Sequence, residues 1–396
     1  MNILIIPGFF RTKDRPTIGS FFWDQARALK RAGHNVTILY SDTYSVKCVR
    51  EYISYAEAAS EECEGIRICR MRIFCPLKHG MEGHREAFAR GIGQLYDRYD
   101  LAEERVDVIH AHCCVWAGYA AMKLSERTGI PYVITEHATL FELHRDQISR
   151  SNDQHIRQAF GKAAKVICVS RAFAKKISKY RTSDDLEVIG NVVDFDRFRI
   201  CDNESHSGMR FLTVCYMNTE DQLRKKGVDV LLGAWKDFSG KQPAARLLIG
   251  GDGPARQKAM EWCRNYGVES SVDFTGALSR EQVAARMQAC DAFVLPSRYE
   301  TFGVVYIEAM ACGKPVIAAA NGGPDDFVTE DNGILIPPDD TGRLVQAMEQ
   351  MVQKMQDQKA YDAEVIRNSV RERFGGQAIA GQLERVYEAV GADSGT

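Results

Sequence analysis

The chain has 396 residues, of which 45% are apolar and 26% charged, and its 51 basic residues nearly balance 53 acidic ones. This composition is typical of a globular protein of two or three domains, and it argues against a disordered chain or a nucleic-acid binder. No uncharged apolar run reaches the ~20 residues that cross a bilayer, and the first ten residues lack the basic start of a signal peptide. Twelve scattered cysteines without a CxxC pair indicate reduced thiols, so we expect a cytoplasmic protein.

The charge is distributed unevenly along the chain. Residues 1–190 contain 28 Lys and Arg against 23 Asp and Glu, a balance of +5, and the remaining residues contain 23 against 30, a balance of −7. Residues 162–181 include seven basic residues and no acidic one. A solvated helix face is one interpretation of this run. The other is a surface for anionic lipid headgroups or a lipid-linked diphosphate acceptor, which would place the protein peripherally at the inner face of a membrane.

The chain opens with a strand, a helix and a second strand. The apolar run at 2–6 is followed by a loop with Gly8 and Gly19, by apolar residues at helical spacing up to Gly33, and by a second run at 36–40. Such a unit begins a doubly wound sheet. Further runs, apolar nearly throughout as in a parallel sheet covered on both faces, lie at 107–112, 131–137, 165–170 and 186–190.

A second series of strands follows an irregular segment. Residues 191–209 lose periodicity, so we predict a first domain at 1–195, a linker at 196–203 and a second domain at 204–375. The α/β pattern predicts two tandem Rossmann-like, doubly wound domains that bind ligands at the carboxyl ends of their strands, in an interdomain cleft. The apolar runs of the second domain lie at 211–217, 245–251, 272–276, 291–296, 315–320 and 333–338.

The most informative segment is 296–318, with the sequence PSRYETFGVVYIEAMACGKPVIA. It reads as the end of a buried strand, a short loop, and a helix that Gly313 and Pro315 end. The amides of 301–304 would then form a helix N-terminus, whose partial positive charge suits a phosphate. These four residues are Thr301, Phe302, Gly303 and Val304.

Two glutamates belong to this segment. Glu300 precedes the helix, and Glu308 lies inside it, more than one turn further on. A carboxylate accepts hydrogen bonds from a sugar diol, so the pair suits a diphosphate flanked by a hexose and a ribose, which is a nucleotide sugar. The alternative is a solvated Glu300 and a Glu308 paired at the helix surface.

The segment resembles the signature of the retaining glycosyltransferases of family 4, in which Glu, seven residues and Glu precede AMA-x-G-x-PVIA. The resemblance implies a GT-B fold and transfer of a sugar, with retention, from a nucleoside diphosphate to an acceptor hydroxyl, without a catalytic metal or other cofactor. It also implies that a C-terminal helix at 377–392 packs back on the first domain. Collinear matches are TEH at 135–137, GNVVDFDRF at 190–198, KKGVDVLL at 225–232, GGDGP at 250–254 and NGGPDDFV at 321–328.

The resemblance assigns roles to residues of the second domain. Glu300 would touch the donor sugar, Glu308 would hold the ribose, and Lys226 would bind the diphosphate, on which charge develops as the sugar leaves. By itself Lys226 reads as a surface lysine at a helix start. The family's arginine just before it is missing, because Cys215, Tyr216 and Met217 stand there, and Arg224 or Lys225 is left as its replacement.

In the first domain the resemblance points to Gly19, whose amide would approach the donor phosphate, and to His137, which would reach the transferred sugar. A turn glycine and a structural histidine are the alternatives, and His112 is a weaker candidate than His137. Asp194 and Asp196 form a DxD, but within the matched linker, so we expect them to be structural and predict no metal site. The GGDGPA segment at 250–255 does not complete a dinucleotide fingerprint.

These patterns predict a glycosyltransferase of bacterial polysaccharide or glycolipid synthesis. Its partners would be a nucleoside-diphosphate sugar and a sugar or lipid-linked acceptor. A nucleotide-sugar epimerase and a non-catalytic nucleotide-sugar-binding protein share the architecture and stay open as alternatives.

Overall fold

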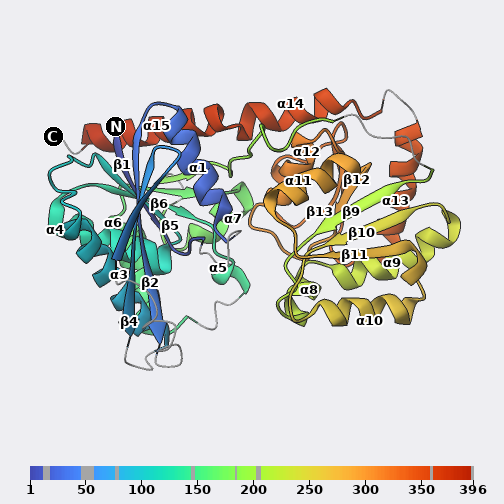
Figure 1. Ribbon diagram of the computed structural model, residues 1–396, viewed down its shortest axis with the longest axis horizontal. Helices are drawn as coiled ribbons and strands as arrows, with labels where there is room; N and C mark the ends of the chain where they lie inside the picture. Colours follow the sequence, from blue (N-terminus) through green and yellow to red (C-terminus); the bar gives the residue numbers. More distant parts are fainter. Residues whose placement is uncertain are drawn as a thin grey trace. The chain divides into compact units, whose positions relative to one another are not determined.

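The computed structural model describes residues 1–11, 18–45, 58–75, 80–143, 148–182, 185–201, 207–356 and 360–393. The chain divides into two compact units, Met1–Val192 with Gly376–Thr396, and Val193–Gly375. Each unit is built around one sheet, coloured blue to green in the first and yellow to orange in the second (Figure 1). Among the described residues no helix is both long and apolar enough to span a bilayer.

The first unit contains an eight-stranded sheet in the order β3-β4-β2-β1-β5-β6-β7-β8. Neighbouring strands run parallel except β3 and β4, which form an antiparallel pair at one edge. The strands are β1 (Asn2–Pro7), β2 (Asn35–Ser45), β3 (Ala58–Cys63), β4 (Ile66–Cys75), β5 (Val108–His112), β6 (Tyr132–Glu136), β7 (Lys165–Cys168) and β8 (Leu186–Val188).

Helices follow the parallel strands of this unit, as the apolar periodicity predicts. Ser149 and Ser170 cap the N-termini of two of these helices. Each serine side chain accepts a hydrogen bond from the backbone amide three residues further along the chain. The C-terminal helix α15 packs against α1, and His34 lies 2.8 Å from Glu384 of α15. The helices are α1 (Ser20–Arg31), α3 (Gly80–Arg98), a π-helical turn (Cys114–Gly118), α4 (Tyr119–Thr128), α5 (Leu140–Leu143), α6 (Arg150–Lys162), α7 (Arg171–Ile177) and α15 (Gly376–Asp393).

The second unit contains a six-stranded, fully parallel sheet in the order β11-β10-β9-β12-β13-β14. Phe211, Trp235 and Phe238 pack their rings against one another in its core. The strands are β9 (Arg210–Val214), β10 (Arg246–Gly250), β11 (Val272–Gly276), β12 (Ala292–Leu295), β13 (Val316–Ala319) and β14 (Gly333–Ile336). The helices are α8 (Glu220–Lys225), α9 (Val228–Lys241), α10 (Arg256–Tyr266), α11 (Arg280–Ala289), α12 (Val304–Ala311), α13 (Thr341–Gln356) and α14 (Ala363–Phe374).

The prediction of two Rossmann-like, doubly wound units is confirmed, but the division between them falls elsewhere than the predicted boundary. Residues 193–201 belong to the second unit, because Val193 donates a backbone hydrogen bond to Phe374 and Phe198 is fully buried. Residues 202–206 lie outside the described residues. The strands β3 and β4 were not predicted, because β3 is acidic and exposed and β4 alternates, as suits a half-exposed edge pair.

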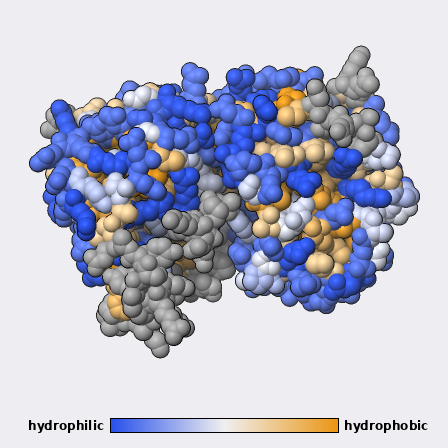
Figure 2. All heavy atoms as spheres, viewed as in Figure 1, coloured by the Kyte–Doolittle hydropathy of each residue, from blue (hydrophilic) through white to orange (hydrophobic). Residues whose placement is uncertain are grey.

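Hydrophilic residues cover most of the face shown in Figure 2, with hydrophobic residues visible between them, most extensively on the second unit. The exposed large apolar side chains of the described residues are few and scattered along the sequence.

Candidate active site

An ion pair joins two of the predicted site residues at the carboxyl end of β12. Lys226 Nζ lies 2.6 Å from Glu300 Oε1, and Ser297 Oγ donates to the same oxygen at 2.9 Å. The Glu300 side chain is 9% exposed and the Lys226 side chain 22%, so water screens their attraction only in part. The fold therefore brings together two charges that stand 74 residues apart in the sequence.

The glycine after Lys226 explains how the two loops approach. Gly227 adopts a left-handed conformation with φ of 68° at the start of α9. A Cβ at this position would lie 2.0 Å from the carbonyl oxygen of Pro296, so no other residue fits without a shift of the backbone. Close contact between the two loops places Lys226 beside Glu300.

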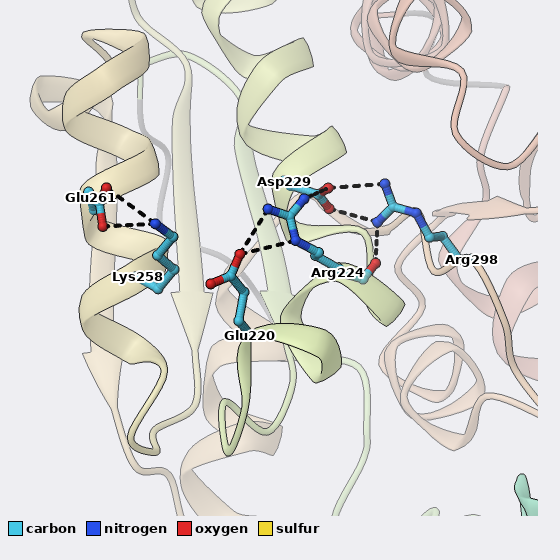
Figure 3. Close-up of polar contacts among 6 residues, drawn as sticks. All are labelled: Glu220, Arg224, Asp229, Lys258, Glu261 and Arg298. Atoms are coloured by element: carbon cyan, nitrogen blue, oxygen red, sulfur yellow. Dashed lines mark hydrogen bonds and ion pairs between the residues drawn. The ribbon is translucent and has the colours of Figure 1, made fainter. Parts of the chain in front are cut away.

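Arg298 connects the segment that precedes Glu300 to the segment around Lys226 (Figure 3). Its guanidinium donates to both carboxylate oxygens of Asp229, at 2.8 and 3.0 Å, and to the carbonyl of Arg224. Its Nε lies 2.6 Å from Asp339, and its backbone amide donates to Lys225 at 2.8 Å. A two-pronged arginine–carboxylate pair fixes distance and direction, so Arg298 sets the position of the loop that carries Glu300.

Replacing Arg298 with alanine is expected to lower the free energy of unfolding by about 1 to 2 kcal/mol, because several charge-assisted hydrogen bonds are lost at once. Lys258→Ala is the matched control. It removes an exposed pair with Glu261 one turn away on α10 and should change stability by less than about 0.5 kcal/mol (Figure 3). Urea unfolding of both variants measures the difference, and equal effects would mean that Arg298 contributes no more than a surface charge.

The two replacements considered for the missing family arginine lie in different surroundings. Arg224 is half exposed, and its guanidinium contacts Glu220 at 2.8 Å and Asp229 at 3.4 Å (Figure 3). It also lies over the face of Trp262. The Lys225 ammonium lies 5.7 Å from the ring centre of Tyr299, and burial and the neighbouring Lys226 lower its pKa. Arg224 thus already has partners of opposite charge. The replacement of the missing family arginine by Arg224 or Lys225 stays a prediction.

The helix predicted after Glu300 begins at Val304, with Gly303 as its N-cap residue at φ of 94°. A Cβ on Gly303 would lie 2.5 Å from the ring of Tyr306, which explains the glycine. No side chain among the described residues caps the first turn, so its backbone amides face outward from the helix end. This arrangement suits an anion, as the sequence analysis proposed for the amides of 301–304.

Phe302 has a structural role in addition to its predicted one. Its ring is 2% exposed and packs against Phe327 and Phe374, with ring centres 5.4 and 5.2 Å apart. The side chain therefore anchors the loop, so any contact of Phe302 with a phosphate would have to be made by its backbone.

Glu308 lies on α12 and is 2% exposed. It forms an ion pair with Arg280, the first residue of α11, whose guanidinium lies 5.2 Å from the ring centre of Phe198. Glu308 is thus buried rather than at the helix surface. Arg280 could not be predicted as a site residue, because a basic residue after a helix-capping serine carries no signal for a partner 28 residues away.

The candidates of the first unit lie at the carboxyl ends of its central strands. Gly19 is the N-cap residue of α1, with φ of 70°, and a Cβ there would lie 3.0 Å from the carbonyl oxygen of Phe9. His137 follows β6 and is 8% exposed. Its Nε2 lies 3.1 Å from Nδ1 of His112, and the rings of Phe21 and Phe22 pack against it.

Glu136 holds the loop that carries His137. Its carboxylate is fully buried and accepts hydrogen bonds from the backbone amides of Cys114, His137 and Ala138, at 2.6, 2.9 and 2.7 Å. Burial raises the pKa of Glu136 to about 7, although these three amides act against the rise. Burial also lowers the pKa of His137 to about 3, so this imidazole is neutral at pH 7 and can donate from one nitrogen while accepting at the other.

Acid is expected to destabilise the protein through His110, which lies 2.6 Å from the Tyr387 hydroxyl and 2.7 Å from that of Thr135. Burial lowers the pKa of His110 from 6.5 to about 3. A depressed pKa contributes stability that is fully present above pH 6.5 and is lost as the pH falls towards 3. Lowering the pH from 7 to 5 should therefore cost about 2 kcal/mol of the free energy of unfolding through this group.

Urea titrations at pH 7 and pH 5 measure this loss. His110→Gln cannot take up a proton at this position and should lose about 2 kcal/mol less than the wild type over the same interval. An equal loss in the two proteins would contradict the role given to His110.

Two other sequence features have structural contacts. Asp194 accepts hydrogen bonds from the backbone amides of Asp196 and Arg197, in accord with the structural reading of the DxD. Within the basic run, Lys162 pairs with Glu126 and Arg181 donates to backbone carbonyls that include Phe160. Across the described parts of the chain, no three His, Cys, Asp or Glu side chains are grouped so that they would hold a metal ion.

Comparison with known proteins identifies the family. Residues 18–197 match the model of Glycosyltransferase Family 4, and residues 219–367 match the model of Glycosyl transferases group 1. The chain belongs to this family of retaining GT-B glycosyltransferases, which use nucleoside-diphosphate sugars as donors.

Relatives resemble the chain over nearly its whole length. TuaC of Bacillus subtilis, a glycosyltransferase provisionally assigned to teichuronic acid biosynthesis, is 25% identical over 98% of this chain and 99% of its own. The structure of sucrose-phosphate synthase from Thermosynechococcus elongatus superimposes with a TM-score of 0.78, at 20% identity, over 99% of this chain and 100% of that one. Anabaena HepE in complex with UDP gives a TM-score of 0.71 at 18% identity, over 98% and 100%.

Proposed function

We propose that the protein transfers a sugar from a nucleoside-diphosphate donor to a hydroxyl of a sugar or lipid-linked acceptor, in the synthesis of a bacterial polysaccharide or glycolipid. The observation that carries this proposal is the ion pair of Lys226 and Glu300, beside an uncapped helix end in a unit with a Rossmann-like sheet. HepE, a protein of similar fold, has been solved with UDP and with UDP-glucose, which supports a nucleotide-sugar donor. The assignment of TuaC supports a polysaccharide product.

Binding of the donor would separate the ion pair, because each of its two side chains would contact a different part of the donor. A diphosphate carries more negative charge than one carboxylate, so we expect it to draw Lys226 away from Glu300 and towards itself. Glu300 would then accept hydrogen bonds from hydroxyls of the sugar, and the amides of Thr301, Phe302, Gly303 and Val304 would complete the phosphate site.

Other residues would bind the remaining parts of the donor. Glu308 would hold the ribose, with Arg280 fixing its carboxylate, and Arg224 or Lys225 would add positive charge near the diphosphate. From the first unit, Gly19 and His137 are proposed to contact the phosphate and the transferred sugar. Lys226 would stabilise the charge that develops on the leaving diphosphate, and attack by the acceptor on the same face of the sugar would retain the configuration.

Thermal stabilisation by a panel of nucleoside-diphosphate sugars tests the donor. A ligand at 100 times its dissociation constant adds about 2.7 kcal/mol of stability, so a matching donor should be evident. Proton NMR of the products then separates the alternatives. An epimerase would convert the donor with no acceptor present, and a binding protein would release no nucleoside diphosphate. Either result would contradict the proposed transfer.

Peripheral contact of residues 162–181 with an anionic membrane is also part of the proposal. Sedimentation with vesicles of phosphatidylglycerol and phosphatidylcholine, compared with phosphatidylcholine alone, tests it. Lys162 pairs with Glu126 and Arg181 with Asp185, so these two side chains contribute less unpaired positive charge to a membrane contact.

A further inference from the structure

Two arginines of the first unit meet over one aromatic ring. The guanidinium carbons of Arg11 and Arg70 lie 5.9 and 5.1 Å from the ring centre of Phe10, and Arg70 Nη1 donates to the backbone carbonyl of Arg11 at 2.5 Å. Arg11 also stacks on Trp23, with 4.0 Å between its guanidinium carbon and the ring centre. Aromatic contacts hold both side chains in defined positions.

Negative charge at this cluster is less than the positive charge. Glu61 Oε1 lies 3.3 Å from Arg70 Nη2, but its side chain is 59% exposed, so the pairing is weakened by water. Among the described residues no carboxylate lies within ion-pair distance of Arg11, and its guanidinium donates instead to the weak acceptor Cys63 Sγ at 3.6 Å. Glu61, which pairs with Arg70 alone, is thus the one described carboxylate at a cluster that holds two cations.

Arg70 carries a further sign of incomplete pairing. Its Nε is buried and has no hydrogen-bond partner, whereas a quarter of the side chain is exposed. Burial and the neighbouring Arg11 lower the pKa of Arg70, which means that the environment disfavours its charge. Bringing a second anion to the exposed edge of this pair would relieve that cost.

The cluster lies level with the carboxyl ends of the central strands β1 and β5, although Arg70 itself is in the middle of the longer strand β4. Strand pairing aligns Arg70 with Tyr40, and Pro7 at the end of β1 with His112 at the end of β5. Two consecutive phenylalanines connect the arginines to the surroundings of His137. Phe9 packs on the Phe21 and Phe22 rings, which contact His137. Phe10 contacts both arginines. A ligand group at the arginines would therefore be part of a molecule bound at the carboxyl ends of the strands.

We propose that Arg11 and Arg70 form a binding site for an oxyanion, a phosphate or a carboxylate, carried by the acceptor substrate. Guanidinium groups match the planar edges of both anions, and a positively charged pair beside aromatic rings would select an anionic acceptor over a neutral one. The inference rests on the proposed glycosyl transfer, because it names the chemical class of the acceptor of that reaction.

Calorimetric titration of the full-length protein tests this site, with inorganic phosphate, sodium glucuronate and neutral glucose as probes. A saturating nucleoside diphosphate, chosen by the thermal screen, keeps phosphate out of the donor site. We expect phosphate or glucuronate to bind and glucose to show no binding at the same concentration. Phosphate alone would identify a phosphorylated acceptor, and glucuronate alone an acidic sugar.

Variants locate the site. Arg70→Gln and Arg11→Gln should each weaken binding of the anion at least tenfold, Arg70→Lys should weaken it less, and Glu61→Gln should strengthen it because the competing carboxylate is gone. Arg67→Gln is the matched control. It lies on the same strand with similar exposure but pairs with Glu104, and it should leave the affinity unchanged.

The outcomes separate this site from the proposed function. Absence of anion binding, or an affinity that Arg70→Gln and Arg11→Gln leave unchanged, would overturn the site. Binding of the nucleoside diphosphate is measured separately, so its persistence would leave the proposed transfer intact. Failure of every nucleotide to bind would count against the transfer itself, whatever the arginine variants do. Because Arg11 lies in a loop, its variant tests the site even if Arg70→Gln unfolds the edge of the sheet.

Discussion

Replacing Lys226 with alanine is expected to lower kcat/KM about 100- to 1,000-fold, which is the usual effect of removing one group that stabilises charge in a transition state. The ammonium lies 2.6 Å from Glu300, and we propose that it moves to the diphosphate when the donor binds. Charge on the diphosphate grows as the sugar leaves, so the loss should be larger in kcat than in donor affinity. Release of nucleoside diphosphate in the presence of acceptor measures kcat, and calorimetry measures the donor's Kd.

Two further variants define this result. Glu300→Ala should also lower turnover more than donor affinity, because the nucleotide still binds while the sugar loses its position. Lys258→Ala, an exposed lysine on α10 paired with Glu261, should change neither quantity. A Lys226→Ala enzyme whose kcat is unchanged and whose donor Kd alone rises would show that Lys226 only binds the ground state.

Replacing Glu308 with alanine is expected to reduce both donor affinity and stability. Loss of hydrogen bonds from a charged group to the ribose should weaken donor binding by about 1.5 to 3 kcal/mol. The same change leaves Arg280 mostly buried without its carboxylate, which should cost about 2 to 4 kcal/mol of the free energy of unfolding. Calorimetry with the donor and urea unfolding measure the two effects independently.

The double variant Arg280→Ala with Glu308→Ala separates these effects. Removing both charges leaves no buried ion unpaired, so the double variant should be more stable than Glu308→Ala alone. Donor affinity should stay low, because the ribose contact is still missing. Recovery of donor affinity in the double variant would contradict the role of Glu308, and unchanged affinity in Glu308→Ala would do the same.

Long apolar strands made most of the fold predictable. The central strands of both sheets are apolar nearly throughout because helices cover both faces, and these runs appear directly in the sequence. The antiparallel pair β3 and β4 did not appear in this way, since β3 is exposed and acidic and β4 alternates. The start of the second unit was also misplaced, because the burial of Phe198 depends on contacts with residues far along the chain.

Residues of the candidate site were predictable from the sequence only where they belong to a recognisable motif. Lys226, Glu300 and Glu308 belong to short segments that resemble a known family, so they could be named before any contact was known. Arg280 and Arg298 could not, because each acquires its role from a carboxylate 28 or 69 residues away. Tertiary contacts of this kind depend on how helices and loops pack, and no local pattern encodes them.

The most direct test of the proposed diphosphate site is a ratio of affinities. For the base that the thermal screen selects, calorimetry gives the Kd of the nucleoside diphosphate and that of the nucleoside, in the wild type and in Lys226→Ala. We expect the wild type to bind the diphosphate far more tightly than the nucleoside, and the Lys226→Ala variant to lose at least tenfold of this preference while its nucleoside Kd stays the same. A preference that is equal in both proteins would mean that Lys226 does not meet the diphosphate.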